Sequence, residues 1–191
     1  MKYREMAGEK ISVLGFGCMR FPTTSKNAED IDAEKSAKIL EYAIENGVNY
    51  FDTAYVYHGG KSESFIGGVL KPYRDKIHIA TKCPTWEVKC EEDFDRLLNE
   101  QLERLQTDYI DFYLMHALDK DRFKNVVEKF NLIDKLNKAK ADGKIRHIGF
   151  SFHDDVETFK KIIDANPDWE FCQIQLNYIN VKYQAGLEGL E

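Results

Sequence analysis

Strand-like and helix-like segments alternate along the whole of this 191-residue chain, and this alternation limits its fold more strongly than any other feature. Short apolar segments recur about every 25 to 37 residues, with a helical pattern between successive segments, as in parallel βα units. Such alternation predicts an α/β protein, built either as a βα barrel or as a doubly wound open sheet. The strands are expected at residues 11–17, 48–51, 77–81, 109–115, 146–150 and 171–176, with residues 2–6 pairing with the first as a hairpin.

Apolar residues spaced three and four positions apart predict the helices that separate these strands. Asp32 and Asp155 are expected to cap two of the helices, and Gly47 is expected to end the first. The helices are expected between residues 32 and 47, 62 and 71, 91 and 106, 121 and 142, and 155 and 167.

The length of the chain sets how much of a barrel it can form. An eight-unit barrel takes about 250 residues, whereas 191 residues supply about six strands. If the fold is a barrel, we therefore expect a (β/α)8 TIM-type barrel that is truncated after about the sixth strand. Residues 1–191 would then form a single barrel domain, incomplete at its C-terminus.

Charge and composition exclude several classes of function. Lys and Arg number 27 against 33 Asp and Glu, a formal charge of −6, and the signs are interspersed, so no basic face for nucleic acid or anionic membrane is expected. No apolar run approaches the roughly 20 residues of a membrane helix, and the first residues lack the apolar core of a secretion signal, which predicts a soluble cytoplasmic protein. The four cysteines show no CxxC spacing and are expected as reduced thiols, and no histidine spacing indicates a metal site.

Polar side chains stand where three consecutive strands are expected to end. Asp52 directly follows one strand, and Tyr57 comes five residues later, across a short loop. Lys82 and His116 stand at the ends of the next two strands. Because the carboxyl ends of parallel strands open on one rim, a carboxylate, a phenol, an ammonium and an imidazole are expected to converge there.

This set of groups suits the reduction of a carbonyl. A lysine ammonium beside a tyrosine hydroxyl favours the phenolate, which makes the phenol a usable proton donor near neutral pH, and an aspartate keeps the lysine charged and in place. A histidine can donate a hydrogen bond to the carbonyl oxygen and orient the substrate. Taken singly, each of these residues is more often a cap, a turn residue or a packing residue. Their joint occurrence at consecutive strand ends favours the catalytic interpretation.

The spacing of these residues resembles that of the aldo-keto reductase family. The segment DTAYVY at residues 52–57, followed by Gly59 and Glu63, is similar to the signature of that family. Residues 81–82 and 114–116 fall where the family has its lysine and histidine motifs. The resemblance spans nearly the whole chain, and it favours the barrel over the open sheet.

The resemblance also implies a function and a cofactor. It implies an NADP-dependent oxidoreductase that reduces an aldehyde or ketone with hydride from NADPH, with NADH as the alternative, and that acts on a small-molecule carbonyl substrate. The catalytic residues it implies are Asp52, Tyr57 as the proton donor, Lys82 and His116. The residues it implies in binding the nicotinamide cofactor are Met19, Arg20, Asp52, Ser151 and Gln173.

One departure from the family pattern keeps a second hypothesis open. The family places a Ser-Asn pair at the nicotinamide carboxamide, but Phe152 follows Ser151 here. The alternative is therefore a low-turnover sensor or regulatory protein that binds the cofactor. The family's loops for the adenosine phosphates would follow Glu191, as would the iron–sulfur segment that similar bacterial members carry, so an iron–sulfur cluster is expected only in such a region. The oligomeric state is left open.

Overall fold

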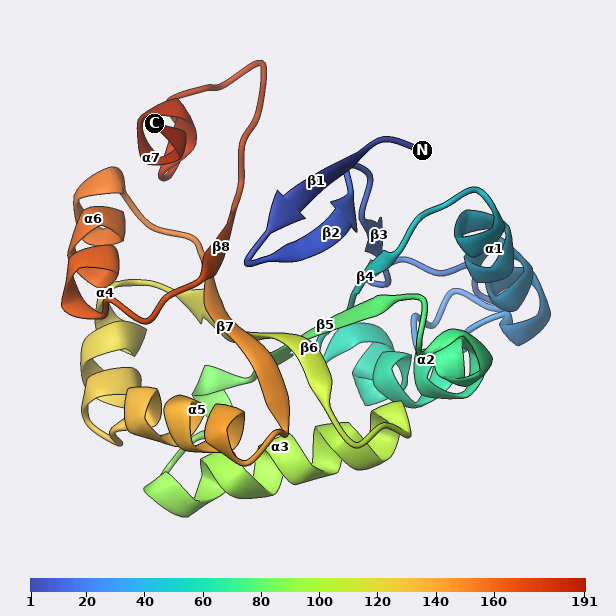
Figure 1. Cartoon of the computed structure of the whole chain (residues 1–191), viewed down its shortest axis with the longest axis horizontal. Helices are drawn as coiled ribbons and strands as arrows, with labels where there is room; N and C mark the ends of the chain where they lie inside the picture. The colour runs from blue at the N-terminus through green and yellow to red at the C-terminus, as the bar shows by residue number, and fades with distance from the viewer.

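Six parallel strands form the centre of the protein, in a computed structural model that describes residues 1–191. Each strand pairs with the next one along the chain, in the order β3-β4-β5-β6-β7-β8. A doubly wound sheet would reverse its strand order, whereas this sequential order belongs to a barrel, and Figure 1 shows the sheet curled as an open half-barrel. The strands are β3 (Phe16–Gly17), β4 (Tyr50–Asp52), β5 (His78–Cys83), β6 (Ile110–Leu118), β7 (Ile145–Phe152) and β8 (Phe171–Ile174).

The predicted N-terminal hairpin forms, and it covers the inner face of the sheet. β1 (Tyr3–Met6) pairs antiparallel with β2 (Glu9–Ser12), and the hairpin lies on the concave side of the half-barrel (Figure 1). Ile11 packs there against Ala80, Phe112 and Leu114. Most of the other apolar side chains of the strands pack in a larger cluster that includes residues of the helices. Because both faces of the sheet are covered, its strands carry nearly continuous apolar runs.

Helices follow the convex side of the sheet (Figure 1). Asp32 caps α1 by accepting a hydrogen bond from the backbone of Lys35, and Asp155 caps α6 in the same way through Thr158, as predicted. Gly47 has a φ of 86° in the turn that follows α1. No helix is both long and apolar enough to cross a membrane. The helices are α1 (Ala33–Glu45), α2 (Ser62–Leu70), α3 (Glu91–Leu105), α5 (Leu132–Ala141), α6 (Val156–Ala165) and α7 (Gly186–Leu190), with the short α4 between β6 and α5.

The prediction of one strand at residues 11–17 is wrong. Ile11 belongs to the hairpin strand β2, and the core strand β3 begins only at Phe16. The backbone N–H of Ser12 donates to Asn49 Oδ1 at 2.7 Å, and the N–H of Asn49 donates to Ser12 Oγ at 3.1 Å. This pair of hydrogen bonds ends the hairpin strand, and the chain bends before it enters the sheet.

The prediction of one helix between residues 121 and 142 is also wrong. A short α4 (Lys120–Arg122) leads into a π-helical segment, η4 (Phe123–Glu128), and Asn131, with a φ of 50°, separates that segment from α5. On an unbroken α-helix Val127 and Leu132 would lie about 140° apart. Both are fully buried, so the break lets the two segments face the core independently.

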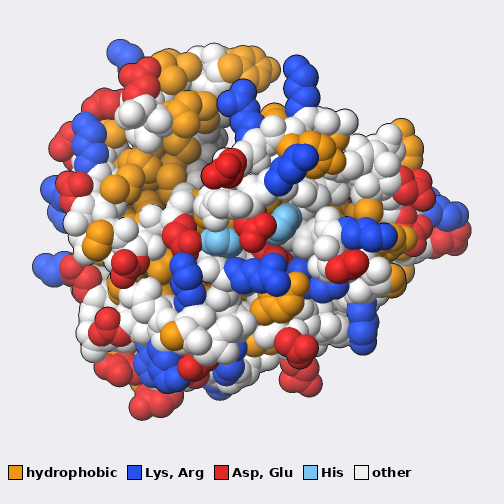
Figure 2. All heavy atoms as spheres, viewed as in Figure 1, with side chains coloured by type: hydrophobic (Ala, Val, Ile, Leu, Met, Phe, Trp, Pro, Cys, Tyr) orange, Lys and Arg blue, Asp and Glu red, His pale blue; other side chains and the backbone are white.

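Hydrophobic side chains gather on the surface beside α7 and the end of β8 (Figure 2). This surface adjoins β8, which is an edge strand of the sheet. The sheet therefore has an open side next to an apolar surface. The exposed large hydrophobic residues of this segment are Leu176, Tyr178, Ile179, Val181, Tyr183, Leu187 and Leu190.

Candidate active site

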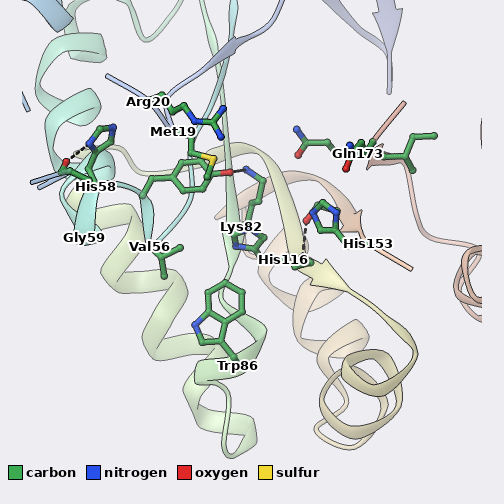
Figure 3. Close-up of a pocket in the computed structure, with 16 residues that line it drawn as sticks. Met19, Arg20, Val56, His58, Gly59, Lys82, Trp86, His116, His153 and Gln173 are labelled. Carbon is green, nitrogen blue, oxygen red and sulfur yellow. Dashed lines mark hydrogen bonds between the residues drawn. The ribbon is translucent and has the colours of Figure 1, made fainter. Parts of the chain in front are cut away.

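The sequence pattern predicted strands that end just before Lys82, His116 and Ser151. In the structure all three residues lie within their strands. β5, β6 and β7 continue through these residues to Cys83, Leu118 and Phe152. The apolar pattern stops at each polar residue, but the backbone pairing of the strands continues. Lys82 and His116 consequently point into the same space at the carboxyl ends of the strands (Figure 3).

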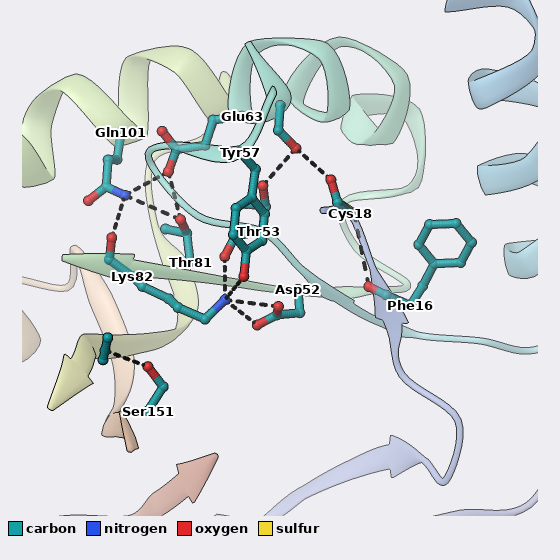
Figure 4. A network of polar contacts seen from close by, with 12 residues as sticks. Phe16, Cys18, Asp52, Thr53, Tyr57, Glu63, Thr81, Lys82, Gln101 and Ser151 are labelled. Carbon is teal, nitrogen blue, oxygen red and sulfur yellow. Dashed lines mark hydrogen bonds and ion pairs between the residues drawn. The ribbon is translucent and has the colours of Figure 1, made fainter. Parts of the chain in front are cut away.

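Asp52 and Lys82 are diagonal neighbours on adjacent strands. Asp52 pairs with Ala80 in the β4–β5 register, and Lys82 follows two residues later on the same face. The ammonium of Lys82 donates to the two oxygens of Asp52, at 2.8 and 2.9 Å, and to the carbonyl oxygen of Thr53 at 2.7 Å (Figure 4). Burial raises the pKa of Asp52, and the attraction of Lys82 opposes this shift. The pair holds a buried positive charge in one position.

Tyr57 reaches the same ammonium from the loop after β4. It opens the short 3-10 segment η1 (Tyr57–Gly60), in which His58 and Gly59 adopt left-handed backbone conformations. The Tyr57 hydroxyl lies 3.4 Å from Lys82 Nζ, and Nζ lies 5.0 Å from the centre of the phenol ring. The ammonium of Lys82 thus faces the carboxylate of Asp52, the carbonyl oxygen of Thr53 and the phenol of Tyr57. The phenol therefore lies beside a positive charge that is held in place.

His116 faces Tyr57 from β6. The two rings meet edge to face, with centroids 6.3 Å apart and an interplanar angle of 82°, and Trp86 packs against His116 at 5.0 Å. Burial lowers the pKa of His116 to about 3, and the positive charge of Lys82 adds to the shift. The imidazole is therefore neutral near pH 7 and carries one N–H, which suits donation to a carbonyl oxygen.

These side chains open into one cavity of about 880 Å³ (Figure 3). Asp52 is not among the residues that line the cavity, because it lies behind Lys82. The structure otherwise brings the residues predicted for catalysis together with those predicted to bind the cofactor. The predicted residues that line the cavity are Met19, Arg20, Tyr57, Lys82, His116, Ser151 and Gln173.

Ser151 and Gln173 present neighbouring polar groups to this cavity. They pair directly in the β7–β8 register. Ser151 Oγ accepts a hydrogen bond from the N–H of Ala117 at 2.7 Å, so its own proton is available for donation. A donor hydroxyl beside a side-chain amide fits a carboxamide such as that of nicotinamide. Phe152 cannot contribute, because it is buried on the other side of β7 and packs against Phe159.

A buried polar network behind Lys82 was not predicted from the sequence, although Glu63 belongs to the motif. Glu63 Oε1 accepts hydrogen bonds from Thr81 Oγ1 and Gln101 Nε2, each at 2.6 Å (Figure 4). Gln101 Nε2 also donates to the carbonyl oxygen of Lys82 at 3.0 Å, and Arg104 pairs with Glu63 at 3.3 Å. The network ties β5 to α2 and α3 at the position of the lysine. A glutamine on the apolar stripe of the α3 pattern was the available signal.

Among the lining residues that were not predicted, Trp86 and His58 have a clear structural role. Trp86 comes from the 3-10 segment η3 (Thr85–Glu87) after β5, and its signal was an aromatic residue in the loop after a strand that carries a predicted site residue. His58 is buried beside Tyr57: its Nε2 accepts from the N–H of Phe21 at 3.0 Å, and its Nδ1 donates to the carbonyl oxygen of Ala28 at 2.5 Å. His58 therefore attaches the segment after Arg20 to the wall of the cavity.

None of the four cysteines lines the cavity. All four cysteines are free, and burial raises the pKa of the Cys18 and Cys83 thiols, so both stay protonated. No group of three or more His, Cys, Asp or Glu side chains is arranged to hold a metal ion.

The sequence of this chain is similar to those of known proteins. The model of the "Aldo/keto reductase family" matches residues 13–187. A probable aldo-keto reductase 1 of Glycine max is 32% identical over 153 residues, which cover 75% of this chain and 42% of that protein. An L-galactose dehydrogenase of Arabidopsis thaliana is 32% identical over 151 residues, covering 75% of this chain and 46% of that protein. This chain spans less than half the length of these curated relatives.

Solved structures show the same fold. The holo form of an aldo-keto reductase from Bacillus halodurans is 29% identical, with a TM-score of 0.74 over 92% of this chain and 57% of the other. An aldo/keto reductase from Klebsiella pneumoniae, in complex with NADP and acetate, is 27% identical, with a TM-score of 0.63 over 79% of this chain and 49% of the other. These similarities confirm the predicted TIM-barrel fold class, of which this chain forms an open part.

Proposed function

This chain belongs to the aldo/keto reductase family, and on that basis we propose that it reduces aldehyde or ketone groups of small molecules, with hydride from NADPH and a proton from Tyr57. We propose NADPH as the cofactor, in place of NADH, because a similar structure was solved with NADP. The proposal concerns the activity of the whole protein, because this chain covers less than half the length of these relatives.

One observation carries the proposal: the Tyr57 hydroxyl lies 3.4 Å from the ammonium of Lys82, and Asp52 holds that ammonium from the other side. A phenol that gives up a proton becomes an anion. The buried cation beside it stabilises that anion without any rearrangement, which is how a preorganised charge lowers a reaction barrier. Lysine and aspartate would thus act through the tyrosine.

His116 would orient the substrate. A neutral imidazole opposite Tyr57 can donate a hydrogen bond to the carbonyl oxygen while the phenol donates to the same atom. The low pKa of His116 suits this role, because a protonated imidazole beside Lys82 would place two positive charges in one buried site. Trp86 would pack against the carbon skeleton of the substrate from the loop after β5.

The nicotinamide would be held by the polar pair on β7 and β8. Ser151 and Gln173 would bind its carboxamide, and Met19 and Arg20 would lie along the same wall of the cavity. When bound there, the cofactor supplies the hydride. The residues of this chain contribute the orientation of the ring, the proton and the stabilisation of the phenolate.

The test is a screen of aliphatic and aromatic aldehydes and ketones with NADPH and NADH, on the longest natural protein that contains this chain. We expect NADPH consumption that depends on the carbonyl compound and turns over steadily. A folded protein that binds NADPH but consumes it with none of the compounds would refute the reductase and favour the sensor hypothesis.

A further inference from the structure

A bulge in β6 lies directly beside His116. The register pairs Met115 and Leu118 of β6, three residues apart, with residues of β7 that are only two apart, so β6 carries one extra residue. Bulges bend a strand and redirect its side chains, and they are frequent beside active sites. His116 and Ala117 both line the cavity, although consecutive residues of a regular strand point to opposite faces. The bulge therefore determines where the imidazole lies.

Ala117 carries the unusual backbone conformation of this bulge. Its φ is 54°, in the left-handed region. A non-glycine residue populates this region roughly tenfold less than its preferred conformations, whereas glycine adopts it freely. The bulge persists only if its surroundings hold it.

Three side chains from different elements hold this backbone. Thr85 Oγ1, after β5, donates to the carbonyl oxygen of His116 at 2.9 Å. Ser151 Oγ, on β7, accepts from the N–H of Ala117 at 2.7 Å (Figure 4). Arg122 Nη1, at the end of α4, donates to the carbonyl oxygen of Ala117 at 2.8 Å. Of the three hydrogen bonds, only that of Arg122 involves a charged group. Hydrogen bonds from a charged donor are stronger than those between neutral groups.

The imidazole has no comparable support of its own. Nδ1 of His116 is buried and has no hydrogen-bond partner. The ring is positioned by its backbone and by its packing against Tyr57 and Trp86. A change in the backbone of the bulge would consequently move the ring.

We propose that Arg122 is a positioning residue: by binding the carbonyl oxygen of Ala117, it holds the bulge of β6 in the conformation that directs the His116 imidazole into the cavity. Asp119 keeps Arg122 in place, with Oδ2 2.7 Å from Nη1. Arg122 does not line the cavity, so it does not contact a substrate there. Besides holding the bulge, its positive charge contributes to the low pKa of His116. The inference rests on the proposed function for its effect on turnover, but not for its effect on the position of the ring.

A double-mutant cycle tests this role in the longest natural protein that contains the chain. Arg122→Gln removes the charged guanidinium that binds the carbonyl oxygen, and Ala117→Gly removes the strain that this bond offsets. We expect Arg122→Gln to lower kcat about tenfold, with the Kd for NADPH changed less than about twofold. In the Ala117→Gly background the same substitution should lower kcat less than about threefold. Equal losses in both backgrounds would overturn the proposal, because Arg122 would then act independently of the strain.

A matched control separates this effect from the loss of a surface ion pair. Arg96 also pairs with an aspartate three residues earlier, Asp93, at 2.8 Å, but it contacts nothing in the cavity. Arg96→Gln should leave kcat unchanged, and a loss equal to that of Arg122→Gln would contradict the proposal.

The position of the ring is measured separately from activity. The NMR signals of the His116 ring, assigned with His116→Gln, should shift or broaden in Arg122→Gln and should return towards their original positions in the double variant. Unchanged signals in Arg122→Gln overturn the positioning role. If the signals behave as expected while the unmodified protein reduces no carbonyl compound, the positioning role stands and the proposed function fails.

Discussion

Lys82 Nζ lies 2.8 Å from Asp52 Oδ1, in a position where Lys82 is only 2% exposed. The two residues come from adjacent strands and are brought together by the register of β4 and β5. A buried ammonium depends on such a partner, because an unpaired charge in a protein interior is costly. The pair is thus a fixed point of the site, and the phenol of Tyr57 is placed relative to it.

Tyr57→Phe should abolish carbonyl reduction and leave cofactor binding intact. The substitution removes only the hydroxyl, and the ring can still pack against His116. We expect kcat to fall by at least about 100-fold, the usual size of a lost proton transfer, with the Kd for NADPH changed less than about twofold. Tyr55→Phe is the matched control, because the Tyr55 hydroxyl faces Glu100 at 3.2 Å and not the cavity. Undiminished turnover by Tyr57→Phe would remove the tyrosine from the mechanism.

Asp52→Asn should destabilise the protein by about 3 kcal/mol, because it leaves the Lys82 ammonium buried without a counterion. The double variant Asp52→Asn/Lys82→Met should be more stable than Asp52→Asn, since no buried charge remains. Urea denaturation measures both effects. Asp95→Asn, which breaks an exposed pair with Lys135 at 3.0 Å, should leave the midpoint nearly unchanged. Equal midpoints for the two single variants would show that the Asp52 pair is not buried in solution.

His116 should make the protein less stable in acid. Its pKa is about 3 in the folded protein, against the ordinary value of 6.5. Between these values the unfolded chain binds a proton that the folded protein does not, so the free energy of unfolding falls as the pH falls below 6.5. At about pH 5 this loss amounts to about 2 kcal/mol, and above about pH 7 it is absent.

The measurement compares the parent with His116→Gln by urea denaturation at about pH 7.5 and about pH 5. The free energy of unfolding of the parent minus that of the variant should decrease by about 2 kcal/mol between the two conditions. A difference that does not depend on pH would mean that His116 titrates normally in the folded protein.

Glu63→Gln should destabilise the protein although it preserves the shape of the side chain. Glu63 is fully buried, and one of its oxygens accepts from both Thr81 and Gln101. A glutamine cannot satisfy those donors and Arg104 together, so we expect a loss of about 2 to 4 kcal/mol in urea denaturation. Glu100→Gln is the control, because Glu100 also pairs with Arg104 but has a side chain that is 34% exposed. Matching midpoints for the two variants would contradict the structural role of the network.

Residues 1–191 expressed alone should self-associate and bind NADPH weakly. β3 and β8 are unpaired edges of the sheet, and Tyr178 and Ile179 near β8 are 91% and 82% exposed. Open edges and exposed apolar surface favour association. Size-exclusion chromatography and a fluorescence titration with NADPH measure the two properties. A monodisperse monomer with a Kd of about 1 μM or tighter would contradict this expectation.

The sequence alone determined the fold class and the set of candidate residues. Strand and helix periodicity, the caps at Asp32 and Asp155 and the turn at Gly47 depend on neighbours within a few positions, so they can be read locally. The polar residues at the ends of apolar segments could be placed on one rim as well, because parallel strands bring their carboxyl ends together.

Only the tertiary structure decided how those residues are supported. The helix break at Asn131 lets two segments reach one core, and the bulge at Ala117 is held by side chains from three elements. The network of Glu63 and Gln101 joins residues 38 positions apart. These features depend on distances between elements after packing, and the local spacing of residue types carries no record of such distances. The chemistry of the site is therefore encoded in short motifs, and its geometry is set by the packed barrel.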